Sequence, residues 1–177
     1  MRVANIKYND IANGPGVRTS LFVSGCSHHC FNCFNPETWS FKYGEEYTPE
    51  IEEKIINSLK PDYIEGLTLL GGDPFELVNQ EGLIPLIRRI KNELPSKTIW
   101  CFTGYLYEEL LPTGKMNSTY TDELLSYIDV LIDGEYLDAQ KDITLIFKGS
   151  RNQRTIDVQA SLKEGRVIEL ELDRGRL

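Results

Sequence analysis

Three cysteines lie close together in the stretch "GCSHHCFNC", at positions 26, 30 and 33, and His28 and His29 stand between the first two. Thiolates are ligands for zinc and for iron-sulfur clusters, and an electron-transfer cluster is normally held by four of them. Three thiolates can instead bind three irons of a cubane and leave the fourth iron without a protein ligand. An iron left open in this way can take a substrate or a cofactor.

Zinc is the alternative metal for this loop, because Cys26, Cys30 and Cys33 with either histidine would complete a tetrahedral set. Structural zinc sites usually take pairs of ligands from two separated segments, whereas here every ligand lies on one eight-residue loop. The spacing therefore favours an iron-sulfur cluster. A non-enzymatic zinc or iron-sulfur module remains the second hypothesis.

The fourth cysteine, Cys101, lies in the predicted strand "TIWCFTG" and is expected to be a buried thiol. If it bound the fourth iron, the protein would be a ferredoxin-like electron carrier. The position of Cys101 in a strand and the short spacing of the other three cysteines argue for three ligands.

The overall composition restricts the classes of partner. The chain has 177 residues and a net charge of -8, which is unfavourable for binding a nucleic acid backbone. Residues 1–10 contain no apolar stretch, so the sequence predicts neither a signal peptide nor a membrane helix. We expect a cytoplasmic protein that forms one domain over 1–177.

Predicted strands and helices alternate along the chain. Strands are predicted over 17–25, 66–70, 97–105 and 127–134, and amphipathic helices over 48–60 and 82–94, with a short one over 122–127. This order indicates an α/β fold with a mostly parallel sheet. The chain is too short for eight units, so we expect a partial, open β/α barrel. Residues 155–177 are expected to form a tail, with an edge strand over 166–172.

Each predicted strand is followed by a junction that contains glycine. The carboxyl ends of parallel strands lie at the same end of a sheet, where such folds place their sites. In the "GGDP" junction, glycines allow the backbone to approach a ligand, and free backbone groups could bind an amino acid. The junctions are Gly25-Cys26, Gly71-Gly72-Asp73, Thr103-Gly104 and Asp133-Gly134.

The cysteine loop followed by "GGDP" resembles the radical S-adenosylmethionine enzymes. The resemblance implies that three cysteines hold a [4Fe-4S] cluster and that S-adenosylmethionine chelates the open iron. Reductive cleavage of this cofactor would yield a 5'-deoxyadenosyl radical. The resemblance also implies a partial barrel of the radical S-adenosylmethionine type.

A narrower resemblance covers residues 8–158, in which "NGPGVRTSLFVSGC", "CFNPETW", "GGDP", "WCFTGY", "DVLIDGEY" and "GSRNQR" follow one another. In this order they resemble glycyl-radical-enzyme activating enzymes, specifically those acting on anaerobic ribonucleoside-triphosphate reductase. The implied partners are that reductase as protein substrate and a low-potential electron donor such as flavodoxin or ferredoxin. An activating enzyme of the pyruvate formate-lyase type is the alternative within this class.

The resemblance also assigns the residues of the site. No acid, base or nucleophile of the protein is implied beyond the cluster ligands, because the radical comes from the cofactor. Thr103 and Asp133 are as well explained by a buried capping role, and His28 and His29 by shaping the loop. The implied metal ligands are Cys26, Cys30 and Cys33, and the implied S-adenosylmethionine contacts are Asn32, Cys33, Phe34, Gly71, Gly72 and Asp73.

Overall fold

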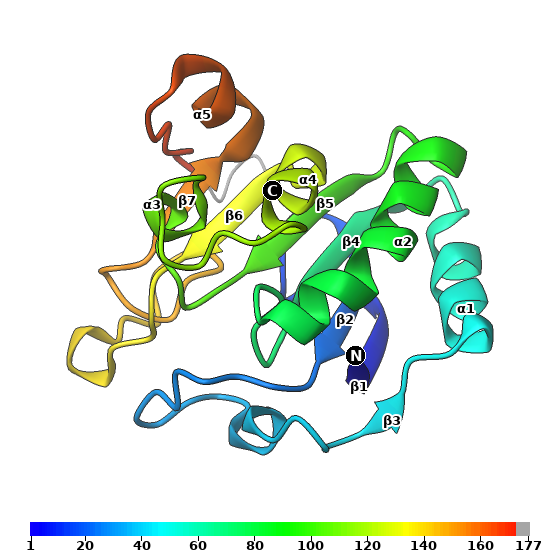
Figure 1. Cartoon of the computed structure of the whole chain (residues 1–177), viewed down its shortest axis with the longest axis horizontal. Coiled ribbons are helices and arrows are strands. Elements are labelled where there is room, and N and C mark those ends of the chain that lie inside the picture. Colours follow the sequence, from blue (N-terminus) through cyan, green and yellow to red (C-terminus); the bar gives the residue numbers. More distant parts are fainter. Residues whose placement is uncertain (173–177) are drawn as a thin grey trace.

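A mixed sheet of seven strands forms the centre of the structure (Figure 1), a computed structural model that describes residues 1–172. The strands are β1 (Arg2–Asp10), β2 (Val17–Val23), β3 (Glu45–Glu46), β4 (Ile64–Gly71), β5 (Thr98–Phe102), β6 (Val130–Asp133) and β7 (Arg154–Asp157). They are ordered β3-β1-β2-β4-β5-β6-β7. The four central strands, β2, β4, β5 and β6, are parallel, whereas β1, β3 and β7 pair antiparallel with their neighbours. The predicted α/β fold with a mostly parallel centre is confirmed.

The four parallel strands lie where the sequence predicts strands, but β1 is an additional strand. Of its nine residues only Val3 is buried, so the apolar alternation that identifies a half-buried strand is missing. Pairing with β2 along most of its length explains why it forms all the same. Strand β1 also supplies Lys7, whose ammonium group lies 5.0 Å from the ring centroid of Phe22 in β2.

The helices occupy the connections between the strands. Helix α1 starts one residue after Thr48, whose side chain accepts a hydrogen bond from the N–H of Ile51, as its sequence predicts. Within residues 1–172, every helix falls short of the length and apolar character needed to cross a bilayer. The α-helices are α1 (Pro49–Leu59), α2 (Leu77–Glu93), α3 (Tyr107–Leu110), α4 (Thr121–Tyr127) and α5 (Val158–Glu164), with 3-10 helices at Pro36–Trp39 and Asp138–Gln140.

Helix α2 begins five residues earlier than the predicted helix, which started at Gly82. This glycine lies inside the helix, where a Cβ would come within 2.4 Å of the Cβ of Met1. Gly82 therefore permits close packing of the N-terminus against α2 and does not mark the start of the helix.

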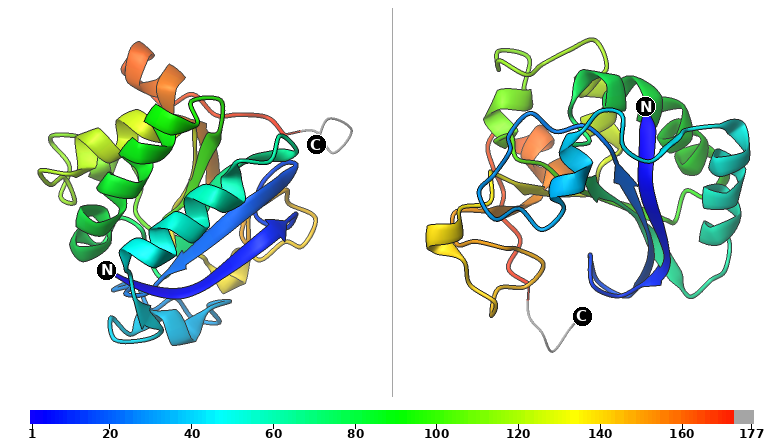
Figure 2. Two further views of the ribbon diagram at one scale, coloured as in Figure 1. Left: turned by 90° about the vertical axis from the view of Figure 1, so that its right-hand side faces the viewer. Right: turned by 90° about the horizontal axis from the view of Figure 1, so that it is seen from below.

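The two faces of the sheet have different partners. Helices α1 and α2 lie side by side on one face (Figure 2), because right-handed crossovers between strands added in one direction all return on the same side. This face carries Leu21, Leu69 and Cys101 in the main apolar core. The opposite face, which we call the inner face, carries Phe22 and Trp100.

The end of the chain differs from the predicted edge strand. The edge strand is β7, which is followed by α5, where the Asp157 side chain accepts a hydrogen bond from the N–H of Ala160. The strand predicted over 166–172 is reduced to one antiparallel bridge beside β7, between Ile156 and Glu169. Hydrogen bonds from the N–H of Asp157 to the Ile168 carbonyl and from the N–H of Leu170 to the Thr155 carbonyl flank this bridge. The Leu170 side chain packs with the apolar residues of the inner face. Residues 173–177 of the predicted tail lie outside the described part of the chain.

Arg18 connects three strands on the inner face. Its guanidinium donates hydrogen bonds to Thr68 Oγ1 at 2.8 Å, to the Leu67 carbonyl at 3.0 Å and to both the hydroxyl and the carbonyl of Thr98 at 3.0 Å. It also lies 5.6 Å from the ring centroid of Trp100. Burial lowers the pKa of Arg18 to about 10, so the side chain remains a cation at neutral pH.

We predict that Arg18→Met lowers the free energy of unfolding by about 2–4 kcal/mol, because the variant leaves buried acceptors without their donor. Urea denaturation followed by circular dichroism measures this change. Arg88→Met is the matched control, since the Arg88 side chain is 54% exposed and pairs with Glu123 at the surface. A loss for Arg18→Met no larger than that of the control would contradict the interpretation.

Candidate functional site

The carboxyl ends of the four parallel strands surround a cavity of about 470 Å³. All four predicted glycine junctions contribute to its wall, which confirms that they meet at one end of the sheet. The three clustered cysteines lie in the same wall. The lining residues are Lys7, Ala12, Asn13, Phe22, Cys26, His28, Cys30, Cys33, Phe34, Asn35, Trp39, Leu70, Gly71, Gly72, Asp73, Phe102, Thr103, Gly104, Gly134, Tyr136, Phe147, Lys148, Gly149 and Gln153.

Backbone hydrogen bonds hold the start of the cysteine loop. Gly25 donates to the carbonyl of Thr38 at 2.8 Å, and Cys26 donates to that of Trp39 at 3.2 Å. The carbonyl of Gly25 accepts from the N–H of Asp73 at 2.8 Å, so the loop is joined directly to the "GGDP" junction. These bonds fix the first cysteine at the end of β4.

The three thiols fit the ligand set of a cubane cluster. Cys26, Cys30 and Cys33 are free and half-buried, and they face one cavity. Within residues 1–172, no three His, Cys, Asp or Glu side chains are gathered around a single ion position. The thiolates of a cubane bind three different irons, so a cluster does not require them to meet at one point.

Burial and nearby carboxylates disfavour the thiolate forms of two cysteines of the loop. Burial, with the nearby charge of Asp73, raises the pKa of the Cys26 thiol to about 12. Burial also raises the pKa of Cys30. Because thiolates and not thiols bind metal, both groups must lose a proton when a metal centre is loaded.

His28 connects the cysteine loop to three strand ends. Its Nδ1 lies 2.7 Å from Glu135 Oε1, its Nε2 lies 3.2 Å from Asp73 Oδ2, and its ring centroid lies 4.3 Å from that of Tyr105. Burial alone would lower the pKa of His28, but the two carboxylates outweigh it and raise the pKa to about 9. A Cβ on Gly104 would come within 2.6 Å of the imidazole, so a glycine is needed beside it. His28 shapes the loop, as expected from the sequence.

The Asp73 carboxylate is buried and bonded within the protein. Its Oδ1 accepts from the N–H of Phe75 at 2.9 Å, its Oδ2 accepts from the N–H of Gly104 at 2.9 Å, and both oxygens lie within 3.0 Å of the Thr103 hydroxyl. Asp73 is only 1% exposed. A contact of Asp73 with S-adenosylmethionine stays a prediction, whereas its joining of two strand ends is an observation.

The two glycines of "GGDP" allow close backbone packing. Gly71 has a φ of 106°, and a Cβ there would lie 2.7 Å from the Val23 carbonyl oxygen. A Cβ on Gly72 would lie 2.4 Å from the carbonyl oxygen of Gly25, next to the first cysteine. The N–H groups of Gly72 and Asp73 already donate to the carbonyls of Val23 and Gly25. Hydrogen bonds from this junction to a ligand would therefore be made by its backbone carbonyl oxygens.

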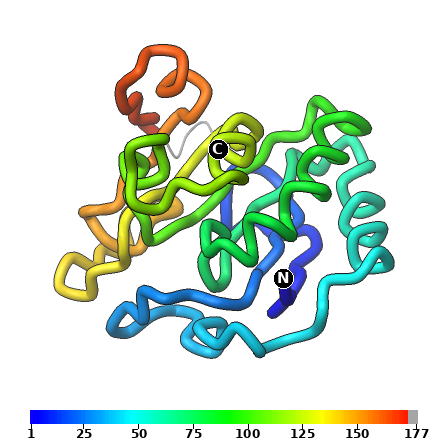
Figure 3. Tube along the Cα trace, in the orientation of Figure 1, coloured from blue at the N-terminus to red at the C-terminus, as the bar shows by residue number. Residues whose placement is uncertain are grey.

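The residues expected on the adenine side are separated by the structure. Phe34 lines the cavity with its ring centroid 5.0 Å from that of Tyr136, where the segment after β2 runs beside the segment after β6 (Figure 3). Asn32 is exposed, has a φ of 55° and is not part of the cavity wall. Contact of either residue with a cofactor stays a prediction.

Three other residues considered from the sequence have clear structural roles. Thr103 donates to Asp73, and buried Asp133 accepts from the N–H of Tyr107 and from Arg154, which supports their interpretation as capping groups. Cys101 is completely buried in the apolar core on the opposite face from the cavity, and burial raises its pKa. It is the buried thiol that the sequence predicts.

Several residues of the cavity wall were not assigned from the sequence. Lys148 and Gln153 belong to the segment that includes "GSRNQR", a motif whose sequence alone indicates no role for its individual residues. Gln153 accepts from the N–H of Gly149 at 2.8 Å and donates to the carbonyl of Gly134 at 3.0 Å. Its side chain therefore fixes the loop that closes one side of the cavity.

Comparison with known proteins supports the interpretation of this cavity as an iron-sulfur cluster site. The family model of the 4Fe-4S single cluster domain matches residues 12–156. The anaerobic ribonucleoside-triphosphate reductase-activating protein of Haemophilus influenzae is 45% identical over 146 residues, which are 81% of this chain and 90% of that protein. The protein of the same name from Vibrio cholerae is 46% identical over the same shares of both chains. That of Enterobacteria phage T4 is 39% identical over 145 residues, 82% of this chain and 86% of the phage protein.

We predict that anaerobic reconstitution loads about four irons per chain, as a cubane requires, and that Cys26→Ala, Cys30→Ala or Cys33→Ala each abolishes loading. Iron and sulfide analysis measures the stoichiometry. Cys101→Ala is the control and should retain the cluster, because its thiol lies on the other face of the sheet. Stoichiometric zinc without iron, or loss of the cluster in the control, would show that the ligand assignment is wrong.

We predict that Asp73→Asn lowers the free energy of unfolding of the metal-free protein by about 2–3 kcal/mol. The reason is that the asparagine amide places its own N–H donors opposite the hydrogen-bond donors of Phe75, Thr103 and Gly104. Urea denaturation gives the value. Thr103→Val removes one donor to Asp73 and the acceptor of the Tyr105 N–H but leaves both backbone bonds of Asp73, and it should cost about 1–2 kcal/mol. Equal stability of Asp73→Asn and the wild type would exclude the proposed joining role.

Proposed function

This chain belongs to the family of anaerobic ribonucleoside-triphosphate reductase-activating proteins and carries a 4Fe-4S single cluster domain, and we propose that it generates a glycyl radical on such a reductase. In this proposal it is a radical S-adenosylmethionine oxidoreductase. The proposal includes the fold, in which the mixed seven-strand sheet would be an open, partial β/α barrel of that class. The electron comes from a low-potential donor such as flavodoxin or ferredoxin.

The observation that carries the proposal is the meeting of Cys26, Cys30 and Cys33 with Gly71 and Gly72 in one cavity. Three cysteine ligands leave one iron of a cubane without a protein ligand. The "GGDP" junction lies against the cysteine loop, so a ligand bound to that iron would also contact the junction. A cavity of about 470 Å³ is within the usual range for cofactor sites.

The proposed ligands fit the residues that are present. Cys26, Cys30 and Cys33 would hold the cluster. When bound, the cluster and S-adenosylmethionine supply an electron and a 5'-deoxyadenosyl radical that can remove hydrogen from a glycine Cα. The proposed S-adenosylmethionine contacts remain Asn32, Cys33, Phe34, Gly71, Gly72 and Asp73.

The protein itself contributes position and exclusion of water. Phe22, Leu70 and Phe102 form an apolar wall of the cavity at the ends of β2, β4 and β5. Such a wall limits the access of water to a reactive group. The hydrogen bonds of Gly25 and Asp73 keep the cysteine loop beside this wall.

A reductase is favoured over other partners by the names of the relatives. An activating enzyme of the pyruvate formate-lyase type would use the same cavity, so the cavity alone does not distinguish the two. A non-enzymatic iron-sulfur carrier is disfavoured because Cys101 is buried away from the other three cysteines.

We predict that reduced, cluster-loaded protein with S-adenosylmethionine forms a glycyl radical on the reductase of its own organism. The amount of 5'-deoxyadenosine released should be about equal to the radical formed, since one hydrogen is removed per cleavage. Electron paramagnetic resonance detects the glycyl doublet, and nucleotide reduction reports on the activated partner.

A formate-lyase-type enzyme, tested under the same anaerobic conditions, is the control partner. A doublet on this control and none on the reductase would move the assignment to the alternative activase. Loaded protein that leaves S-adenosylmethionine intact would contradict the proposal as a whole.

A further inference from the structure

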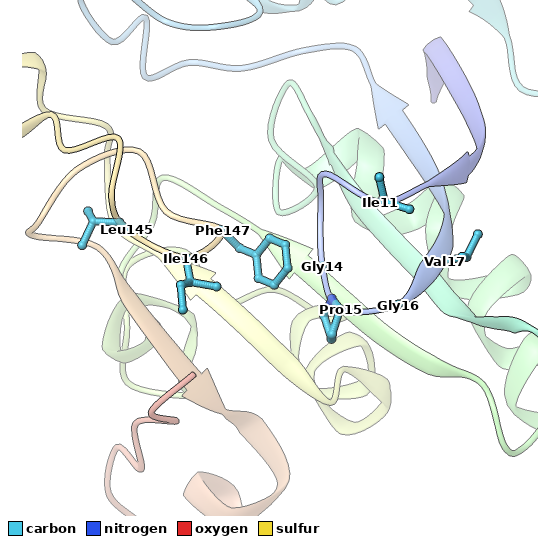
Figure 4. A pocket seen from close by; sticks show the side chains of 8 residues that line it. All are labelled: Ile11, Gly14, Pro15, Gly16, Val17, Leu145, Ile146 and Phe147. Atoms are coloured by element: carbon cyan, nitrogen blue, oxygen red, sulfur yellow. The ribbon is translucent and has the colours of Figure 1, made fainter. Parts of the chain in front are cut away.

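An apolar groove of about 570 Å³ lies beside the cavity, between the loop that joins β1 to β2 and a short segment before β7 (Figure 4). No side chain in its lining carries a charge or a hydrogen-bonding group. The glycines of the first loop leave part of the surface without side chains. The lining residues are Ile11, Gly14, Pro15, Gly16, Val17, Leu145, Ile146 and Phe147.

The groove has a large, exposed apolar side chain in its wall. Ile11, which lines the groove, is 73% exposed. Charged residues make up 26% of the chain, whereas the lining of the groove contains none. Exposed apolar surface of this kind is typical of a binding site.

The groove adjoins the cavity of the cysteines. Phe147 lines both of them, and its ring packs edge-on against Trp100 of the inner face. Ala12 and Asn13, which lie in the chain between Ile11 and Gly14 of the groove, line the cavity. The groove and the cavity therefore adjoin one another at Phe147 and along residues 11–14.

We propose that this groove binds an extended, apolar segment of the partner protein next to the glycine that loses its hydrogen. The inference rests on the proposed function. A glycine within a polypeptide brings its neighbours along when it enters the cavity, so at least one flanking segment must lie on the adjoining surface. An apolar groove with a glycine-rich wall suits such a segment, because the backbones can approach closely while apolar side chains are buried.

Other occupants fit the observations less well. A second copy of this chain would bring two net charges of -8 together, which opposes association. A small apolar ligand would not explain why the groove joins the cavity at Phe147. The partner segment explains both the position of the groove next to the cavity and its apolar lining.

The test places a charge in the groove and measures the partner's affinity. In Ile11→Asp and Ile146→Asp, we expect the dissociation constant of the loaded protein for the purified reductase to rise at least about tenfold, as for an apolar contact at an interface. The reductase concentration for half-maximal radical formation should rise in parallel. Cleavage of S-adenosylmethionine without the reductase should be unchanged, because neither residue lines the cavity.

Leu162→Asp is the matched control. It introduces the same charge at an exposed apolar residue of α5, a helix that contributes no residue to the groove lining. Its affinity for the reductase should equal that of the wild type. Groove variants with a dissociation constant within about twofold of the control would overturn the inference.

A photoreactive benzophenone amino acid in place of Ile11 identifies the occupant directly. We expect cross-linking to the peptide of the reductase that contains the radical glycine. Cross-linking to another part of the reductase or to a second copy of this chain would overturn the inference while leaving the proposed function intact. If the wild-type protein binds the reductase but never forms a radical on it, the proposed function is wrong, whatever occupies the groove.

Discussion

The buried carboxylate of Asp73 is the interaction on which the arrangement of the site depends. It accepts hydrogen bonds from Phe75 in its own junction and from Thr103 and Gly104 after the next strand, and it lies beside His28 of the cysteine loop. A buried carboxylate requires such donors, and the donors would be unsatisfied without it. The strand ends and the loop therefore hold one another in place, so the cavity can have a defined shape before any cofactor binds.

The sheet separates two kinds of chemistry by the direction in which its side chains point. In β5 the thiol of Cys101 faces the apolar core under the helices, whereas the neighbouring Trp100 and Phe102 lie on the inner face. Because alternate residues of a strand face opposite sides, a shift of one residue in this strand would exchange these positions. Strand register thus decides which cysteines are available for a metal.

The sequence alone was sufficient to predict the parallel centre of the sheet and the meeting of its glycine junctions, since both follow from buried strands that end at turn residues. It did not predict β1, because that strand has no apolar face and is stabilised by pairing with its neighbours. It also placed Gly82 at the start of a helix, whereas this glycine lies inside α2, where close packing against Met1 requires a residue without a side chain. For the site, the three cysteines and "GGDP" were found from their spacing. The roles of Glu135 and Gln153 depend on contacts between distant segments, which a local pattern does not reveal.

The hydrogen bonds of Arg18 also have a consequence for the way the chain folds. Its acceptors lie 49 to 80 residues away along the sequence, so the guanidinium cannot be satisfied until β2, β4 and β5 have all assembled. Before that point, burying Arg18 would place a cation without partners in the interior, which is strongly unfavourable. Partly assembled sheets are thereby penalised, and contacts this distant in sequence are slow to form. The parallel strands should consequently be gained and lost together, as one cooperative unit.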